Sequence, residues 1–506
     1  MTVLEREMKF RVPGHFDASG LPGNFGNLVI TDPVVVTLEA VYYDTEDLRL
    51  LAGGMSLRYR DGWMVKLAQP PDRPDLMQRL EVPIDGQDGE IPAQAYDLTR
   101  PALRGASPEP VARLSTKRSV FEVREANGAL QAEIFFDRVS ATRADGGTGA
   151  FHELEVELAE SAPDSLLQPL RDRLDGHGVC EVVAVPKLAR ALGLDSVPDP
   201  PVPVPQLSDR ATAGEVVALS LALSARRFLD HIPAVILDED PEGVHQARVA
   251  TRRLRSDLRT FRRFVERSRA DGLRAGLRTV TRLLGAVRDL DVLQIRLLSV
   301  LDQIQEPERR AADEILSALT MERDEALSLV VEGFRRESFV LLLDELVEFC
   351  AGPELTEAAA APADLTLLKM ARKPWKKVKE MVAGLPDQPS PEQLHRLRIL
   401  VKRARYAAEA VSPVGGEEAE EFAVQLSELQ DVLGEHQDAV VAGDWLRRRE
   451  GAQSLAAGEL IGLEVARATA AAEGWREIWE VAAKPELAMW MTAPQTEGAT
   501  RPRTDN

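Results

Sequence analysis

The chain has 506 residues, 44% of them hydrophobic, which exceeds what one ordinary core requires and predicts two or more domains. Its formal net charge of -20 argues against a general nucleic-acid binder, so any anion site must come from local clusters of Lys and Arg. Cys180 and Cys350 lie far apart in sequence, which excludes a disulfide framework and a cysteine metal cage and fits a reducing compartment. No apolar run approaches the roughly 20 residues of a membrane helix, and the first residues do not resemble a signal peptide. We therefore expect a cytoplasmic protein without a membrane partner.

Short alternating runs, separated by Gly, Pro and Asp turns, make up the first third of the chain. They predict strands at residues 3–12, 34–44, 55–60, 64–68, 77–84, 111–123, 132–141 and 151–159. About eight strands of this kind indicate a closed antiparallel barrel or a sandwich. The pattern predicts helices at residues 165–174 and 187–192, whereas residues 14–33 form a long Gly-rich connection.

A proline-rich segment separates two parts of different pattern. Beyond it, apolar residues recur at spacings of three and four from Ala213 to Ala482, which predicts helices almost throughout. The expected fold class is α+β multidomain, with a β barrel or sandwich followed by an all-α domain. The predicted division is a first domain at 1–195, an extended linker at 196–209, a helical domain at 210–490 and a disordered tail at 491–506.

Charged residues occupy one face of several predicted strands at a spacing of two. In the first strand, charged positions alternate with the apolar Leu4, Met8 and Phe10. The charged positions are Glu5, Glu7, Lys9 and Arg11, then Arg58 and Arg60, Arg79 and Glu81, and Glu153, Glu155 and Glu157. Inside a barrel, such carboxylates would bind a hard cation and such bases would hold phosphate. A solvated sheet face with cross-strand ion pairs is the alternative.

The ordered series of these motifs resembles the CYTH family of triphosphate tunnel metalloenzymes over about residues 1–195. The series is Glu5-x-Glu7-x-Lys9, Tyr43-Asp44-Thr45, Leu57-Arg58-Tyr59-Arg60, Lys66, Arg79-x-Glu81, Lys117-Arg118, Asp137 and Glu153-x-Glu155-x-Glu157. The resemblance implies an eight-stranded antiparallel tunnel that binds triphosphate with Mg2+ or Mn2+ and hydrolyses it or, in some members, cyclises ATP.

The resemblance also assigns roles to single positions. The implied metal ligands are Glu5, Glu7, Glu81, Asp137, Glu153, Glu155 and Glu157. The implied triphosphate ligands are Lys9, Arg11, Arg58, Arg60, Lys66, Arg79, Arg118 and Lys187, and the implied catalytic residues are Glu5, Glu7, Lys9 and Lys66. Family members commonly have Ser-Lys near the end of the domain, whereas here Pro186 precedes Lys187.

An internal repeat marks the helical part. The segments VHQARVATRRLRSDL and LHRLRILVKRARYAA align so that four basic positions match and share one stripe of a helix. The matched positions are His245, Arg248, Arg252 and Arg255 with His395, Arg398, Lys402 and Arg405, and Arg259 prolongs the first stripe. Downstream, Gly285 and Asp289 match Gly434 and Asp438, which predicts two similar halves. We expect the Gly to permit close helix approach and the Asp to orient a basic side chain. Residues 369–379 form another basic cluster.

This duplicated pattern resembles the CHAD family, the conserved-histidine α-helical domain, over about residues 210–485. The resemblance implies a basic surface that binds inorganic polyphosphate. The implied ligands are His245, Arg248, Arg252, Arg255, Arg259, His395, Arg398, Lys402 and Arg405. A solvated helix face, or a surface for nucleic acid or an acidic protein, is the alternative. Few aromatic residues interleave with the basic ones, which disfavours nucleic acid.

The two resemblances together predict metal-dependent hydrolysis of inorganic triphosphate, with polyphosphate bound by the helical domain. A nucleotide cyclase, a thiamine triphosphatase and a polyphosphate-binding protein with an inactive tunnel remain the alternatives. The sequence leaves open the metal, the preferred chain length of polyphosphate and the oligomeric state.

Overall fold

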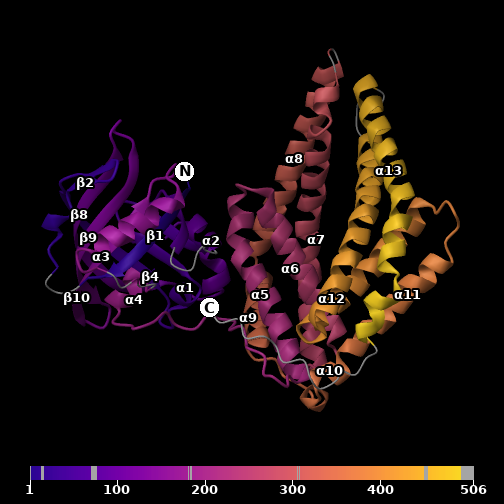
Figure 1. Ribbon diagram of the computed structural model, residues 1–506, viewed down its shortest axis with the longest axis horizontal. Helices are drawn as coiled ribbons and strands as arrows, with labels where there is room; N and C mark the ends of the chain where they lie inside the picture. The colour runs from indigo at the N-terminus through magenta and orange to yellow at the C-terminus, as the bar shows by residue number, and fades with distance from the viewer. Residues whose placement is uncertain are drawn as a thin grey trace. The chain divides into compact units, whose positions relative to one another are not determined.

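The computed structural model describes residues 2–12, 16–69, 77–179, 182, 185–304, 306, 308–448 and 454–491. The chain forms two compact units, Met1–Pro201 and Val202–Asn506 (Figure 1). Residues 196–209, predicted as a linker, contain no helix or strand. The predicted disordered tail, apart from Met491, lies outside the described residues.

Eight antiparallel strands of the first unit close into a barrel, which confirms the predicted fold class. The strands are β1 (Val3–Arg11), β4 (Val34–Asp44), β5 (Met55–Tyr59), β6 (Trp63–Gln69), β7 (Met77–Ile84), β8 (Glu109–Glu125), β9 (Leu130–Arg143) and β10 (Thr148–Leu158). Their order is β8-β4-β5-β6-β7-β1-β10-β9, and β9 pairs back onto β8. A barrel closed in this way leaves no free sheet edge within the ring.

The barrel turns its apolar strand faces outward. Met8 and Phe10 of β1 belong to a core cluster with Leu154 and Val156 of β10. Helix α3 (Leu167–Asp175) covers this cluster with Leu170 and its neighbours. Because alternate residues of a strand point to opposite faces, burying the apolar face outside places the charged face inside.

The Gly-rich connection at residues 14–33 contains a hairpin that the sequence pattern did not predict. Strands β2 (Gly23–Phe25) and β3 (Leu28–Ile30) pair with each other, and β3 continues the sheet along β8. Three residues are too few to show an alternating pattern. Two short helices, α1 (Arg49–Ala52) and α2 (Ala93–Leu103), were also not predicted, whereas α3 and α4 (Lys187–Ala191) lie where helices were expected.

The second unit is helical. Its α-helices are α5 (Ala213–Leu237), α6 (Pro241–Thr260), α7 (Arg267–Leu298), α8 (Glu308–Arg335), α9 (Glu337–Ala351), α10 (Ala363–Thr366), α11 (Arg372–Ala383), α12 (Pro391–Arg447) and α13 (Leu455–Ala482). The two repeat helices begin alike, because Asp240 and Ser390 each cap a helix whose first residue is proline. Helix α12 is interrupted at Gly416, where φ is 68°. Among the described residues, no helix is long and apolar enough to cross a membrane.

Candidate functional site

The barrel encloses a cavity of about 430 Å³. The predicted residues that line it are Glu5, Lys9, Arg58, Arg60, Lys66, Arg79, Glu81, Arg118, Glu155, Glu157 and Lys187. Lys187 reaches it from α4, Arg60 follows directly after β5, and the strands supply the other nine. Glu7, Asp137 and Glu153 are buried behind these residues. Arg11, at the end of β1, is exposed and does not line the cavity.

One network of charges surrounds Lys66. Its Nζ lies 2.8 Å from Oε1 of Glu5 and 2.6 Å from Oε1 of Glu81. The register explains this, since Lys66 stands opposite Glu81 where β6 pairs with β7. Burial alone would raise the pKa of Glu81, but Lys66 and Arg58 lower it. Strands far apart in sequence therefore hold one cation between two carboxylates.

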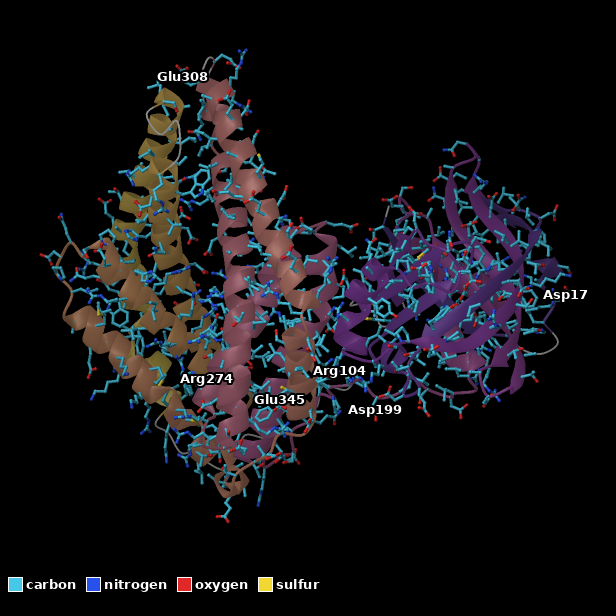
Figure 2. All side chains as sticks on the ribbon, turned by 180° about the vertical axis from the view of Figure 1, so that it is seen from behind. Asp17, Arg104, Asp199, Arg274, Glu308 and Glu345 are labelled. Carbon is cyan, nitrogen blue, oxygen red and sulfur yellow. The ribbon has the colours of Figure 1, made fainter. Side chains whose placement is uncertain are left out.

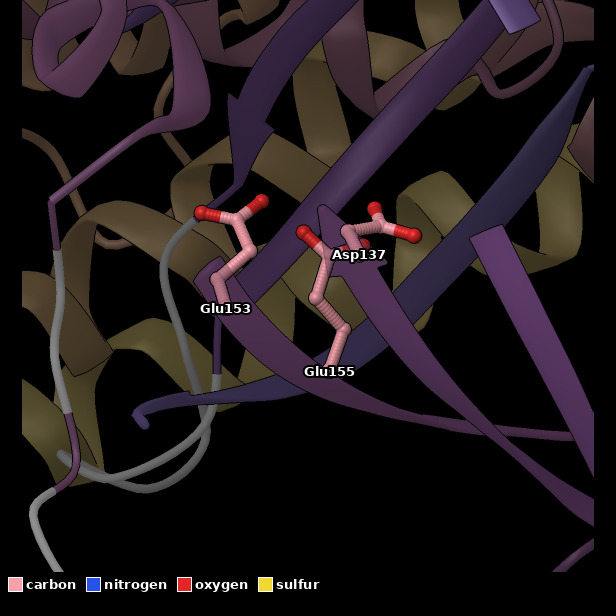
Figure 3. Close-up of side chains that lie close together, drawn as sticks. All are labelled: Asp137, Glu153 and Glu155. Atoms are coloured by element: carbon pink, nitrogen blue, oxygen red, sulfur yellow. The ribbon is translucent and has the colours of Figure 1, made fainter. Parts of the chain in front are cut away.

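A second network surrounds a buried acidic cluster, Asp137, Glu153 and Glu155, drawn in Figure 3. Each offers a carboxylate oxygen, and these oxygens lie within 4.8 Å of one another. Lys187 Nζ lies 2.5 Å from Asp137 Oδ2 and 2.9 Å from Glu153 Oε1. Arg118 binds Asp137 through two hydrogen bonds of 2.8 and 2.7 Å and also reaches Glu155. Three carboxylates this close are a donor set for a hard divalent cation.

The carboxylates of β10 differ in their tendency to ionise. Burial opposes ionisation of Glu155, but Lys187 and Lys9 hold its pKa well below its usual range. Burial raises the pKa of Glu153 despite Lys187. Burial and the nearby Glu5 raise the pKa of Glu157 to about 8. The nearby Lys66 offsets this only in part, and a divalent cation beside Glu157 would favour its charged form.

Arg60 differs from the other cavity cations. In the described part of the chain its side chain forms no ion pair with a carboxylate, and burial together with Arg58 and Arg118 lowers its pKa. Like Arg58, it lines the cavity. Its guanidinium is therefore available to an anion without breaking an internal ion pair.

Sequence reasoning missed two residues of this site. Tyr42 lines the cavity beside Arg58, and the alternation within β4 was a usable signal for it. Arg190 of α4 donates 2.9 Å to Glu153 Oε2 and 3.0 Å to the His152 carbonyl. No sequence motif points to Arg190, because only folding brings α4 against β10.

The helical unit has its own cavity of about 1160 Å³, which we call the groove. The predicted residues that line it are His245, Arg248, Arg252, His395, Arg398, Lys402 and Arg405. The first three belong to α6 and the other four to α12, so the two repeats face one space. Arg288 and Tyr406 also line the groove and were not predicted.

The matched Gly and Asp residues lie beside the matched arginines of the groove in both halves. Arg248 Nη2 lies 3.0 Å from Asp289 Oδ1, and Arg398 Nη2 lies 4.0 Å from Asp438 Oδ1. A Cβ placed on Gly285 would lie 3.5 Å from Arg248 Nε. At Gly434 a Cβ would likewise lie 3.5 Å from Arg398 Nη2. The glycines leave room for a guanidinium rather than for another helix backbone.

The centre of the groove is short of negative charge. Burial and the neighbouring Arg252 and Arg398 lower the pKa of Lys402 to about 6. Burial and Arg288 lower the pKa of His245. Among the described residues, neither Arg252 nor Lys402 forms an ion pair. A bound anion would supply the charge that the protein does not.

Arg255 and Arg259 do not line the groove. They continue the α6 stripe beyond it, where burial and the nearby Arg274 lower the pKa of Arg255 and burial and Arg403 lower that of Arg259. Arg274 lies on α7 far from the tip at which Glu308 begins α8 (Figure 2). The basic surface therefore extends past the groove, although these two predicted ligands stand outside it.

Comparison with known proteins finds two domain families in one chain. Residues 4–181 match the CYTH domain and residues 220–447 match the CHAD domain. Uncharacterised proteins from two strains of Mycobacterium tuberculosis are 28% identical over 475 residues, 88% of this chain and of each relative. Among solved structures, PptA from Streptomyces chartreusis is 23% identical with a TM-score of 0.45, over 53% of this chain and 100% of that chain. The CHAD domain from the plant Ricinus communis is 24% identical with a TM-score of 0.46, over 56% and 95%.

Proposed function

Because the chain joins a CYTH domain to a CHAD domain, we propose that it hydrolyses inorganic triphosphate in the barrel and binds inorganic polyphosphate in the helical groove. The interior of the barrel supports the proposed hydrolysis of triphosphate. Cations from several strands and from α4 face one cavity, together with carboxylates whose oxygens suit a divalent metal. This donor set addresses phosphate and metal together.

The residues of the cavity have two roles, metal binding and phosphate binding. Mg2+ or Mn2+, held by carboxylates among Glu5, Glu7 and Glu157 or by the acidic cluster, would neutralise phosphate charge and lower the pKa of a water. Arg58 and Arg60 would bind phosphate oxygens on the β5 side. Catalysis of phosphoryl transfer consists mostly of such positioning and charge stabilisation.

The internal ion pairs set the cations in place before the substrate arrives. Lys9 lies 3.2 Å from Glu7 and also binds Glu155, and Lys66 lies between Glu5 and Glu81. Carboxylates hold both ammonium groups at the cavity wall. In this proposal a metal ion takes over carboxylates and leaves the ammonium groups to phosphate, which gives Lys9 and Lys66 their predicted catalytic roles.

The direct test is phosphate release by the full chain with Mg2+ or Mn2+ and inorganic triphosphate, measured beside ATP and thiamine triphosphate. We expect triphosphate to be cleaved fastest. Absence of triphosphate cleavage together with formation of cyclic AMP would overturn the proposal in favour of a nucleotide cyclase.

An organic triphosphate is the second candidate, and one observation favours it. Part of the cavity wall is apolar, with Leu38, Ala40, Leu114 and Leu188 facing the space. Inorganic triphosphate has no apolar group to place there, whereas a nucleotide or thiamine triphosphate does. The same assay decides, since a lower KM for thiamine triphosphate than for triphosphate would favour the second candidate.

The groove is proposed to recruit polyphosphate and raise its concentration near the barrel. The supporting observation is the cluster of basic side chains from both repeats, in which, among the described residues, Arg252 and Lys402 form no ion pair with a carboxylate. Arginine and lysine can bind phosphate oxygens there, Arg through two parallel hydrogen bonds. The full chain carrying Arg398→Gln and Lys402→Gln should bind polyphosphate weakly and cleave long chains slowly at low substrate, with unchanged triphosphate hydrolysis. Unchanged polyphosphate binding by this variant would overturn the role of the groove.

A further inference from the structure

Helix α11 carries a third concentration of positive charge, outside both cavities. Six basic residues lie within residues 369–379 and all are exposed. They are Lys369, just before the helix, and Arg372, Lys373, Lys376, Lys377 and Lys379 of α11, and we call the set the α11 lysine face. On the opposite side, Trp375 and Val378 are buried. Trp375 packs against Phe422 of α12 and Trp479 of α13. The helix is thus fixed in the bundle by its apolar side and presents its basic side to solvent.

Little negative charge balances this face. Lys376 Nζ lies 3.5 Å from Glu380 Oε1, but both side chains are more than half exposed, at 74% and 61%. Such an exposed pair contributes little to stability, because water and salt screen it. Within the described residues, Lys369, Lys373 and Lys377 form no ion pair. Like charges three and four positions apart on a helix repel one another, so a bound anion would relieve a cost that the free protein bears.

The chemistry of the face indicates the kind of anion. Five of its six residues are lysines, which act as flexible point charges and impose no fixed geometry on a phosphate. Its one aromatic neighbour, Trp375, is buried and offers no platform for a nucleic-acid base. Trp375 and Val378 of α11 are buried, and Met381 and Val382 pack partly buried against the same core, so these large apolar side chains are not free to insert into a bilayer surface. A linear phosphate chain recognised by charge alone fits these conditions.

We propose that the α11 lysine face is a second contact surface for long-chain inorganic polyphosphate, whose other segment occupies the groove. This inference rests on the proposed polyphosphate binding by the groove. The two segments of α12 meet at the interruption at Gly416 and pack against each other: the first carries His395 and Arg398 in the groove, and the second carries Phe422 beneath α11. A chain held in the groove presents its remaining phosphates to α11 at a high effective concentration. Affinity should therefore increase with chain length beyond what the groove alone accommodates.

The test compares two chain lengths on the full chain. The variant carries Lys373→Gln, Lys376→Gln and Lys377→Gln, and the ligands are a long polyphosphate and a short one that fills only the groove. We expect about tenfold weaker binding of the long chain at low salt, an unchanged affinity for the short chain and a shallower salt dependence. A matched variant with Arg210→Gln, Arg310→Gln and Arg336→Gln removes the same charge from exposed positions elsewhere and should bind both ligands normally.

The outcomes separate this inference from the proposed function. If the α11 variant binds long and short chains as the unchanged protein does, while Arg398→Gln with Lys402→Gln loses both, the inference is wrong and the groove proposal stands. If the groove variant also loses neither ligand, the proposed function fails. Binding of single-stranded RNA or of anionic lipid vesicles is measured in parallel. Loss of either by the α11 variant without loss of long polyphosphate would assign the face to that other partner and overturn the inference.

Discussion

The barrel cavity and the helical groove both gather basic side chains, but they balance the charge in opposite ways. In the barrel, Lys9, Lys66, Arg118 and Lys187 each contact at least one carboxylate. In the groove, Lys402 is surrounded by arginines, and its pKa falls to about 6. A site that interleaves both charges can exchange internal ion pairs for a metal and a phosphate. A site with excess positive charge lowers its free energy when it binds an anion, because the anion relieves the repulsion between its cations.

Removal of divalent metal should have the largest effect, because it should stop the activity of the barrel and leave binding by the groove unchanged. We expect a chelator to abolish phosphate release from triphosphate, because the barrel needs a divalent cation to neutralise phosphate charge and to lower the pKa of the attacking water. The same chelator should leave polyphosphate binding by the groove intact, since arginine and lysine bind phosphate without metal. Restoring Mn2+ or Mg2+ should restore phosphate release. Hydrolysis that survives extensive chelation would contradict the assignment of the barrel.

Arg60 is the cavity cation without an ion pair among the described residues, so its removal should affect substrate binding and not stability. Arg60→Gln should lower kcat/KM for triphosphate about 100-fold, as loss of one charge-stabilising donor typically does. It should leave the melting temperature unchanged, because among the described residues Arg60 forms no ion pair to lose. Arg113 is the control, since it lies exposed on the same barrel and does not line the cavity.

Arg113→Gln should change neither kcat/KM nor the melting temperature. A large loss of stability in Arg60→Gln would show that this guanidinium has a structural partner instead.

Gly285 tests how the groove positions its arginines. Gly285→Ala should bind polyphosphate nearly normally, because its Cβ would make an ordinary 3.5 Å contact with Arg248. Gly285→Leu should weaken binding about tenfold, because a larger side chain displaces the guanidinium and removes a charged hydrogen bond from the ligand. Binding affinity and a thermal melt, measured on both variants, check this. Equal affinities for the two would assign Gly285 a role in helix packing alone.

Alternation of charged and apolar residues predicted most of the barrel. It located eight strands and put Glu5, Glu7 and Lys9 on one face, but alternation cannot say which face is inside. Burial of Met8 and Phe10 beneath α3 decides that, and it depends on contacts far apart in sequence. Alternation predicts toward which face of the sheet a side chain points, but not how far along the barrel the cavity extends. Arg11 shows this, because it lies at the end of β1 and is exposed to solvent.

Periodicity predicted the shared stripe of the groove but not its extent. Arg255 and Arg259 follow Arg252 on the same helix face, yet they lie beyond the cavity, because its extent depends on how α6 and α12 pack together. The ion pairs that join the halves, such as Arg253 with Glu409 and Arg296 with Glu435, have no sequence signature either. Ion pairs that form only through tertiary packing cannot be predicted from the sequence pattern.

The smallest expected effect concerns the pH dependence of the groove. In the free protein Lys402, with a pKa of about 6, is mostly neutral at pH 8. A bound phosphate favours the charged form and raises that pKa, so binding takes up a proton, and affinity should increase several-fold as the pH falls from 8 toward 6. Below about pH 6 the free lysine is already charged and the increase should level off.

The control variant Lys402→Arg keeps its charge throughout, so its affinity should vary less with pH. Terminal phosphates of the ligand also titrate in this range, but they do so equally with both proteins. Identical pH profiles for the two proteins would mean that Lys402 does not touch the ligand.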